Sequence, residues 1–157
     1  MMIRSYLSIL LLATSLFVKS SLAQAVEPLV FTCVRAEQQY TETYEFRIDP
    51  ATKNQKAKVF VDGRDLDRTD EMGGQVVRSV VMSKDAALIS IQADFLPERY
   101  DGVQYGPGLV STFINVHLLT GRLIKTETIQ GGILSATLGN GTQTYQEQCA
   151  VMKRSAP

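Results

Sequence analysis

Apolar and polar residues alternate with a period of two along most of the chain after residue 28. In one clear case, Tyr44, Phe46 and Ile48 are separated by Glu45 and Arg47. Successive side chains of a β-strand point to opposite faces of its sheet, so this pattern predicts strands that are buried on one face. The 3.6-residue period of an amphipathic helix hardly appears. The segments that carry the strand pattern are 29–33, 43–48, 56–61, 76–82, 87–95, 110–116, 122–129 and 143–151.

Residues typical of turns separate these segments. Asp, Asn, Gly, Pro and Ser are frequent at 49–54, 62–63, 83–85 and 119–121, where each favours a tight change of direction. Short links between consecutive strands predict an antiparallel meander. Residues 64–74 fit this scheme least, since they are compatible with either a loop or a helical turn.

The first 25 residues have the three parts of a secretory signal peptide. Arg4 supplies the basic start, residues 6–18 form an apolar run, and Ala23 and Ala25 put small residues where a signal peptidase reads them. Cleavage is expected after Ala25, leaving 26–157 as a single β domain. The apolar run is too short to cross a bilayer, which takes roughly twenty residues. We therefore expect a periplasmic or secreted protein without a membrane span.

The only two cysteines are Cys33, in the first predicted strand, and Cys149, in the last. In an exported chain such a pair most economically forms one structural disulfide. Closing nearly the whole domain would stabilise it by about 4–5 kcal/mol through the entropy of the unfolded chain. The bond would also bring the first and last strands together. We therefore predict an all-β fold, a small up-and-down barrel or coiled sheet of about eight strands, with a two-sheet β-sandwich as the alternative.

Composition and charge argue against several partners. The chain carries 16 basic and 16 acidic residues, and removal of the signal peptide takes away Arg4 and Lys19 but no acid, so the mature chain is slightly acidic. Proteins that bind nucleic acid need a basic face, so no nucleic-acid partner is expected. The cysteines lack a C-x-x-C spacing and there is one histidine, so no metal site and no cofactor are predicted.

His117, the only histidine, is the first candidate for acid–base catalysis. On its strand it shares a face with Ser111, Phe113 and Asn115, so it is expected to face solvent just before a turn. The sequence has neither a G-x-S-x-G turn nor an S-x-x-K motif. We therefore predict that the protein is not an enzyme, with a hydrolase built on His117 or a carboxylate pair as the hypothesis to exclude.

Two further segments resemble ligand sites only in part. The acidic residues of 62–71 could offer oxygen atoms to calcium, but they lack the spacing of an EF-hand loop, so a solvated polar loop is favoured. The glycines at 131, 132, 139 and 141 lack the lysine and the helix of a phosphate-binding loop. They are interpreted as bends around a short strand or loop over 133–138.

The connection 95–108 is the strongest candidate for recognition. It is long for a strand connection, and it contains two prolines together with Phe95, Arg99, Tyr100 and Tyr105. Aromatic residues and arginine are enriched at contact surfaces, so these four residues form a possible protein- or ligand-contact loop. The alternative is that the aromatic side chains fold over the open end of the barrel and plug it.

These features favour a non-enzymatic periplasmic binding or inhibitor module, a rigid β scaffold that presents 95–108, with or without 62–74, to a protein or a small apolar ligand. The alternative is a structural or accessory cell-envelope protein that assembles through its sheet. In that case Phe60, Leu88 and Phe113 should form one contiguous apolar patch. A pocket inside the structure, in place of an interior filled with side chains, would favour a small ligand.

Overall fold

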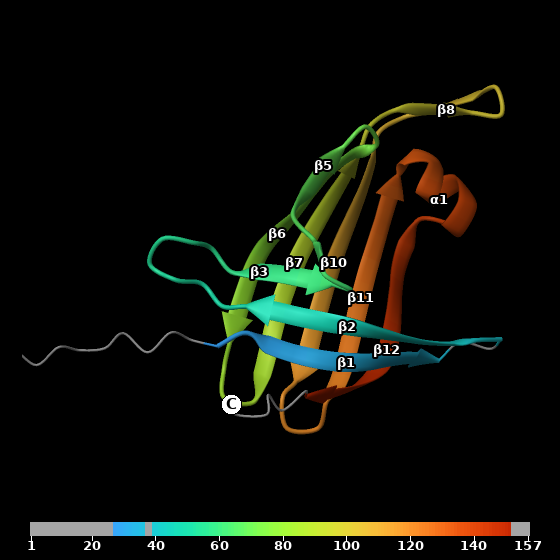
Figure 1. The fold of residues 1–157 in the computed structure, drawn as a ribbon. Coiled ribbons are helices and arrows are strands. Elements are labelled where there is room, and N and C mark those ends of the chain that lie inside the picture. The colour runs from blue at the N-terminus through green and yellow to red at the C-terminus, as the bar shows by residue number, and fades with distance from the viewer. Residues whose placement is uncertain (1–26, 37–38, 152–157) are drawn as a thin grey trace, which may run out of the picture.

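The predicted strands form one large antiparallel sheet (Figure 1). The computed structural model describes residues 27–36 and 39–151, so the predicted signal peptide lies outside the described residues. Each of the predicted segments is a strand. They are β1 (Leu29–Ala36), β2 (Thr41–Asp49), β3 (Lys58–Val61), β6 (Gly73–Met82), β7 (Ala86–Phe95), β10 (Gly108–His117), β11 (Arg122–Gly131) and β12 (Gly141–Val151).

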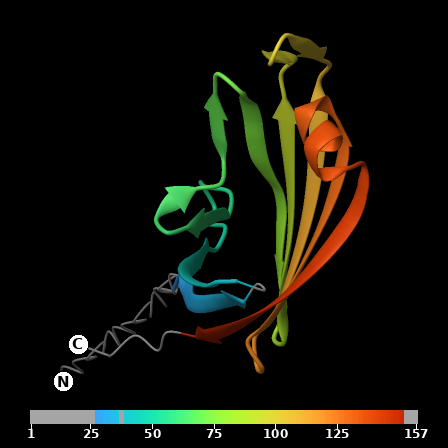
Figure 2. The ribbon, with the colours of Figure 1, turned by 90° about the vertical axis from the view of Figure 1, so that its right-hand side faces the viewer.

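The first and last strands are neighbours in this sheet. The strand order is β4-β3-β2-β1-β12-β11-β10-β7-β6-β5, and Cys33 of β1 lies directly opposite Cys149 of β12. The two residues form the predicted disulfide, with a sequence separation of 116. The continuous sheet curls until it is nearly closed into a barrel (Figure 2). The all-β prediction is therefore confirmed, and it takes the barrel form because there is one curled sheet in place of two stacked ones.

Side chains close the barrel where the two edges of the sheet meet. Two short strands, β4 (Arg64–Asp65) and β5 (Arg68–Asp70), form these edges. Between them, Asp67 accepts a hydrogen bond of 2.6 Å from the backbone N–H of Val77 on β6, and its other oxygen lies 2.6 Å from Nζ of Lys56. We call this junction the seam. Residues 64–74, expected as a loop or a helical turn, are ordered as short strands because these contacts hold them.

The connection 95–108 is a two-stranded ribbon. Its strands are β8 (Glu98–Tyr100) and β9 (Val103–Tyr105), joined by Asp101 and Gly102. Both turn residues have positive φ, 47° and 75°, which suits a two-residue hairpin turn that follows the twist of the strands. Figure 1 shows the ribbon extending away from the barrel. The alternative to a contact loop, a plug of aromatic side chains over the open end, is therefore not formed by this ribbon, and Tyr100 is exposed.

Residues 133–138, expected as a short strand or loop, belong to a helix, α1 (Gly132–Leu138). The helix has no side-chain cap, no acid in its first turn and no base in its last turn, so the usual sequence signals for a helix are missing. A Cβ on Gly132 would lie 2.9 Å from Cα of Gly108, and the φ of Gly132 is 65°. Glycine is needed here because the backbone leaving β11 passes so close to the start of β10.

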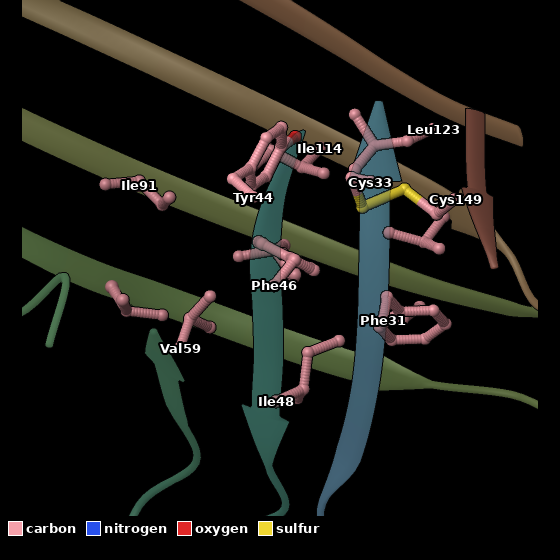
Figure 3. Packing of buried hydrophobic residues seen from close by; sticks show 14 residues of the cluster. Phe31, Cys33, Tyr44, Phe46, Ile48, Val59, Ile91, Ile114, Leu123 and Cys149 are labelled. Atoms are coloured by element: carbon pink, nitrogen blue, oxygen red, sulfur yellow. A yellow bond between two sulfur atoms is a disulfide. The ribbon is translucent and has the colours of Figure 1, made fainter. Parts of the chain in front are cut away.

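The hydrophobic core fills the part of the barrel that β1, β2 and β3 enclose (Figure 3). Phe31 of β1 and Phe46 of β2 are fully buried, and their ring centroids are 6.2 Å apart. Ile48 of the same strand β2, Ile89 of β7 and Leu123 of β11 complete the packing. The disulfide lies within this cluster, so the covalent link and the apolar core stabilise the same region.

Candidate functional site at the mouth of the barrel

The barrel is open at one end, because the strands of its wall, β6, β7, β10 and β11, are longer than the strand β3 that faces them. Strands β6, β7, β10 and β11 have 10 residues each, whereas β3 has 4. A cavity of about 280 Å³, here called the mouth cavity, lies above the core at this end. Its floor is apolar and consists of Phe46, Ile91, Ile114 and Leu123. Its rim is charged and consists of Arg35, Glu42, Asp62, Arg64, Lys125 and Glu127.

A buried carboxylate fixes one wall of the mouth cavity. Of the described residues, Glu147 of β12 is the only buried one with a charged side chain. Tyr44 donates its hydroxyl hydrogen to Oε2 of Glu147, and Nε of Arg35 donates to Oε1 at 2.9 Å. Nη1 of Arg35 also lies 3.6 Å from Oε2 of Glu42 on the neighbouring strand. Since both oxygens of the buried carboxylate have a donor, the charge is compensated and the three side chains hold one another in place.

The network also fixes the protonation states of its members. Burial, together with the hydrogen bond to Glu147 and the negative charge of that residue, raises the pKa of Tyr44 well above its ordinary value. Burial alone would lower the pKa of Arg35, but the hydrogen bond and the charge of Glu147 outweigh it and raise that pKa. Tyr44 therefore stays neutral and Arg35 stays charged over the whole physiological range.

A dependence of stability on alkaline pH follows from the raised pKa of Tyr44. In the unfolded chain a tyrosine ionises near pH 10, while folded Tyr44 keeps its proton, so folding binds a proton above that pH. The stabilisation is complete below pH 10 and falls by up to about 1.4 kcal/mol per pH unit above it. Urea unfolding at pH 9, 10 and 11 should show a steeper loss for the natural protein than for Tyr44→Phe. Equal slopes for the two proteins would contradict the assignment.

On the rest of the rim, some charged side chains are paired and one is not. Lys125 lies 3.2 Å from Oε1 of Glu127, and its Nζ is 4.8 Å from the centroid of the Tyr145 ring. Asp62 accepts a hydrogen bond from the backbone N–H of Glu45 at 2.8 Å. Arg64, the first residue of β4, makes no ion pair with any described residue. The rim therefore combines preformed ion pairs with one cation that is available to a ligand.

The predicted contact loop lies apart from the mouth cavity, and none of its four candidate residues lines it. Phe95 belongs to β7 and pairs with Gly73 and Gly108 in the main sheet. On the ribbon, the pairing places Tyr100 and Tyr105 on one face and Arg99 on the other. Tyr100 is 64% exposed. Contact with a partner through these residues stays a prediction.

The other candidate residues make local contacts. His117 is exposed at the end of β10, and its Nδ1 lies 3.1 Å from Oγ1 of Thr120 in the following turn. Among the acidic residues of 62–71, Asp65 binds Nζ of Lys58 at 2.5 Å. Although burial would raise the pKa of Asp65, the hydrogen bonds from Lys58 and from the backbone of Asp67 lower it. The described residues contain no group of three side chains that could hold a metal ion.

The expected outer patch forms only in part. Leu88 and Phe113 are diagonal neighbours on the outside of β7 and β10, because Ser90 pairs with Phe113 and Leu88 with Asn115. Phe60 lies on β3, at the seam, where the guanidinium of Arg47 lies 3.9 Å from its ring centroid. The prediction that Phe60 joins Leu88 and Phe113 in one contiguous apolar patch is therefore wrong.

The charged residues inside the barrel were not predicted from the sequence, although strand alternation places them there. Glu147 falls between Tyr145 and Cys149 on the inner face of β12, and Arg35 follows Cys33 by two positions on β1. A charged residue at an inward position costs free energy unless it is paired, so it marks either a partner or an opening to solvent. Here both apply, because the pair lies at the mouth.

The chain matches no protein-family model, and no curated protein or solved structure is significantly similar to it. In the described residues there is no helix with the length and apolar character needed to cross a membrane. The disulfide between Cys33 and Cys149 indicates folding outside the reducing cytoplasm.

Proposed function

We propose that the protein is an exported, non-enzymatic binding module, periplasmic or secreted, that takes a small ligand into the mouth of its barrel. The observation that carries the proposal is the division of the interior into two parts. One part is filled by core side chains, and the other is the open mouth cavity with an apolar floor and a charged rim. A barrel that served only as a scaffold would have no need to leave this end unfilled.

The chemistry of the cavity suits an amphipathic molecule. Small-molecule sites are concave and mostly apolar, with a few polar groups that fix orientation, and have volumes of roughly 300–1,000 Å³. The mouth cavity, at about 280 Å³, is near the lower limit, so the ligand is expected to be small. Its apolar part would cover Ile91 and Ile114, while its polar end would meet Arg64 and the ion pairs of the rim. Because these pairs are formed before the ligand arrives, little order has to be gained on binding.

A filled cavity should abolish binding without unfolding the protein. Thr112 lines the mouth cavity on β10, and the larger side chain of Thr112→Phe would occupy part of it at a cost of about 1–3 kcal/mol in stability. Ligand-observed NMR with a library of small fragments, each with an apolar ring and one charged group, should detect binders to the natural protein. The same fragments should not bind Thr112→Phe.

The matched control is Ser111→Phe, which places the same side chain one position earlier, on the outer face of β10. This variant should bind the fragments as the natural protein does. Fragments that bind all three proteins equally, or a library without any binder, would rule out the mouth cavity as the ligand site.

A further inference from the structure

On the outer surface of the barrel wall, a group of neighbouring side chains contains no charged residue. Strand pairing arranges these side chains in three rows across β7, β10, β11 and β12, on the side of the wall away from β1–β3 (Figure 2). We call them the uncharged face. The rows are Gln92, Ser111, Thr128 and Thr142; Ser90, Phe113, Thr126 and Thr144; and Leu88, Asn115, Ile124 and Gln146.

The absence of charge is specific to this face. Charged residues make up 20% of the chain, and exposed surfaces usually hold more than that. Charged residues occur at its borders, where Asp94 and Arg122 occupy the next row at either end and Arg78 lies in the bulge of β6. The face is thus uncharged over its whole extent and charged immediately outside it.

Hydroxyl and amide groups dominate the uncharged face. Thr126 and Thr144 lie opposite each other with their Oγ1 atoms 3.3 Å apart, and Thr128 and Thr142 have theirs 2.9 Å apart. Each hydroxyl can donate one hydrogen bond and accept two, and each amide side chain offers donors and an acceptor. The ladder therefore keeps spare donors and acceptors that point to solvent.

An exposed aromatic ring lies in the middle of these polar groups. Phe113 is 62% exposed, its diagonal neighbour Leu88 is exposed too, and so is Val81, which pairs with Leu88 from β6. A ring this open to water loses the benefit of burial, so it is a natural point of contact for a partner. The flat π-face attracts C–H groups, which carry partial positive charge.

The size and charge of the face restrict what covers it. Four strands about 4.8 Å apart and three rows about 6.8 Å apart span on the order of 400 Å². A stable dimer buries about 800 Å² on each partner, so a second copy is not favoured. A charged partner would lose hydration without finding an opposite charge. A neutral partner with many hydrogen-bonding groups remains.

From this combination we propose that the uncharged face binds a neutral polysaccharide. Sugar hydroxyls exchange hydrogen bonds with the Thr, Ser, Asn and Gln side chains, and the C–H face of one sugar ring packs on Phe113. A broad surface of regularly spaced hydrogen-bonding groups, with an open hollow at its Asn115 and Ile124 end, suits an extended chain more than a single small molecule. This site lies on the opposite side of the wall from the mouth cavity and is independent of the ligand proposed there.

Affinity electrophoresis of the mature protein tests the proposal. Native gels cast with dextran, hydroxyethylcellulose or glycol chitin should retard the natural protein in at least one of these polymers. Phe113→Ala should weaken the binding about tenfold, through the loss of ring contact. Thr144→Lys, which introduces a charge into the face, should weaken it as well. Leu119→Ala removes an exposed apolar side chain from the turn between β10 and β11 and should leave the retardation unchanged.

Other outcomes would overturn the proposal. These are retardation in none of the three polymers, equal retardation of the natural protein and Phe113→Ala, or retardation only in charged dextran sulfate. Sedimentation that shows a dimer, lost in Phe113→Ala, would assign the face to a second copy. Thr112→Phe should still be retarded, so failure at the mouth cavity and failure at this face are distinguishable.

Discussion

Replacement of both cysteines, in the variant Cys33→Ala/Cys149→Ala, is expected to lower the free energy of unfolding by about 5 kcal/mol. The disulfide spans 116 positions, and opening a loop of that order restores roughly 4.7 kcal/mol of chain entropy to the unfolded state. Both cysteines are buried in the core, so smaller side chains also leave a void. A small domain has a total stability of about 5–15 kcal/mol, so the variant should be close to unfolding.

Denaturant unfolding followed by circular dichroism measures this loss. Where the double variant does not fold, the natural protein with and without a reducing agent gives the same comparison. A loss below about 1 kcal/mol would contradict this entropic contribution of the disulfide. Mass spectrometry that found both thiols free in the mature protein would remove the disulfide from the account of stability.

The second large effect concerns the buried carboxylate. Arg35→Ala leaves Glu147 in the interior with only the hydroxyl of Tyr44 as a partner, and loss of one member of a buried ion pair costs about 3–5 kcal/mol. The paired variant Arg35→Met/Glu147→Leu removes both charges and should be more stable than Arg35→Ala. Thermal and urea unfolding of the two variants gives the comparison.

The exposed pair of Arg68 and Asp70, with 3.9 Å between Nη1 and Oδ2, provides the control. Arg68→Ala should change the stability by less than about 0.5 kcal/mol, because solvent screens such pairs and side-chain entropy opposes them. A similar cost for Arg68→Ala and Arg35→Ala would show that the position of Glu147 inside the barrel has no special energetic importance.

The barrel could be predicted because the apolar residues and the buried positions alternate along the strands with the same period of two. Phe31 and Cys33 of β1, like Ile89 and Ile91 of β7, recur every second position and all are buried. The two cysteines added a long-range contact that no local pattern contains. The alternation and the cysteine pair together predicted the long strands, their antiparallel order and the junction of β1 with β12.

Elements held by contacts distant in sequence escaped prediction. The strands β4 and β5 are short, and they are ordered by the carboxylate of Asp67 and its donors on β6 and in the 50–57 connection. The helix α1 lacks capping signals and follows two glycines whose role depends on the approach of β10. The mouth cavity arises from unequal strand lengths across the barrel, and strand boundaries are the part of a sequence pattern that is hardest to fix.

The strands follow one another around the barrel as in a ring, and the first and the last described strand are neighbours in it. This junction has both a backbone ladder and a disulfide between β1 and β12. The least secured junction, the seam, is crossed by an unbroken peptide at residues 66–67. A circularly permuted chain could therefore be made by linking residue 151 to residue 29 and cutting the chain at the seam. This chain would keep every pairing between long strands. Its new termini would lie at the junction with the fewest contacts between strands.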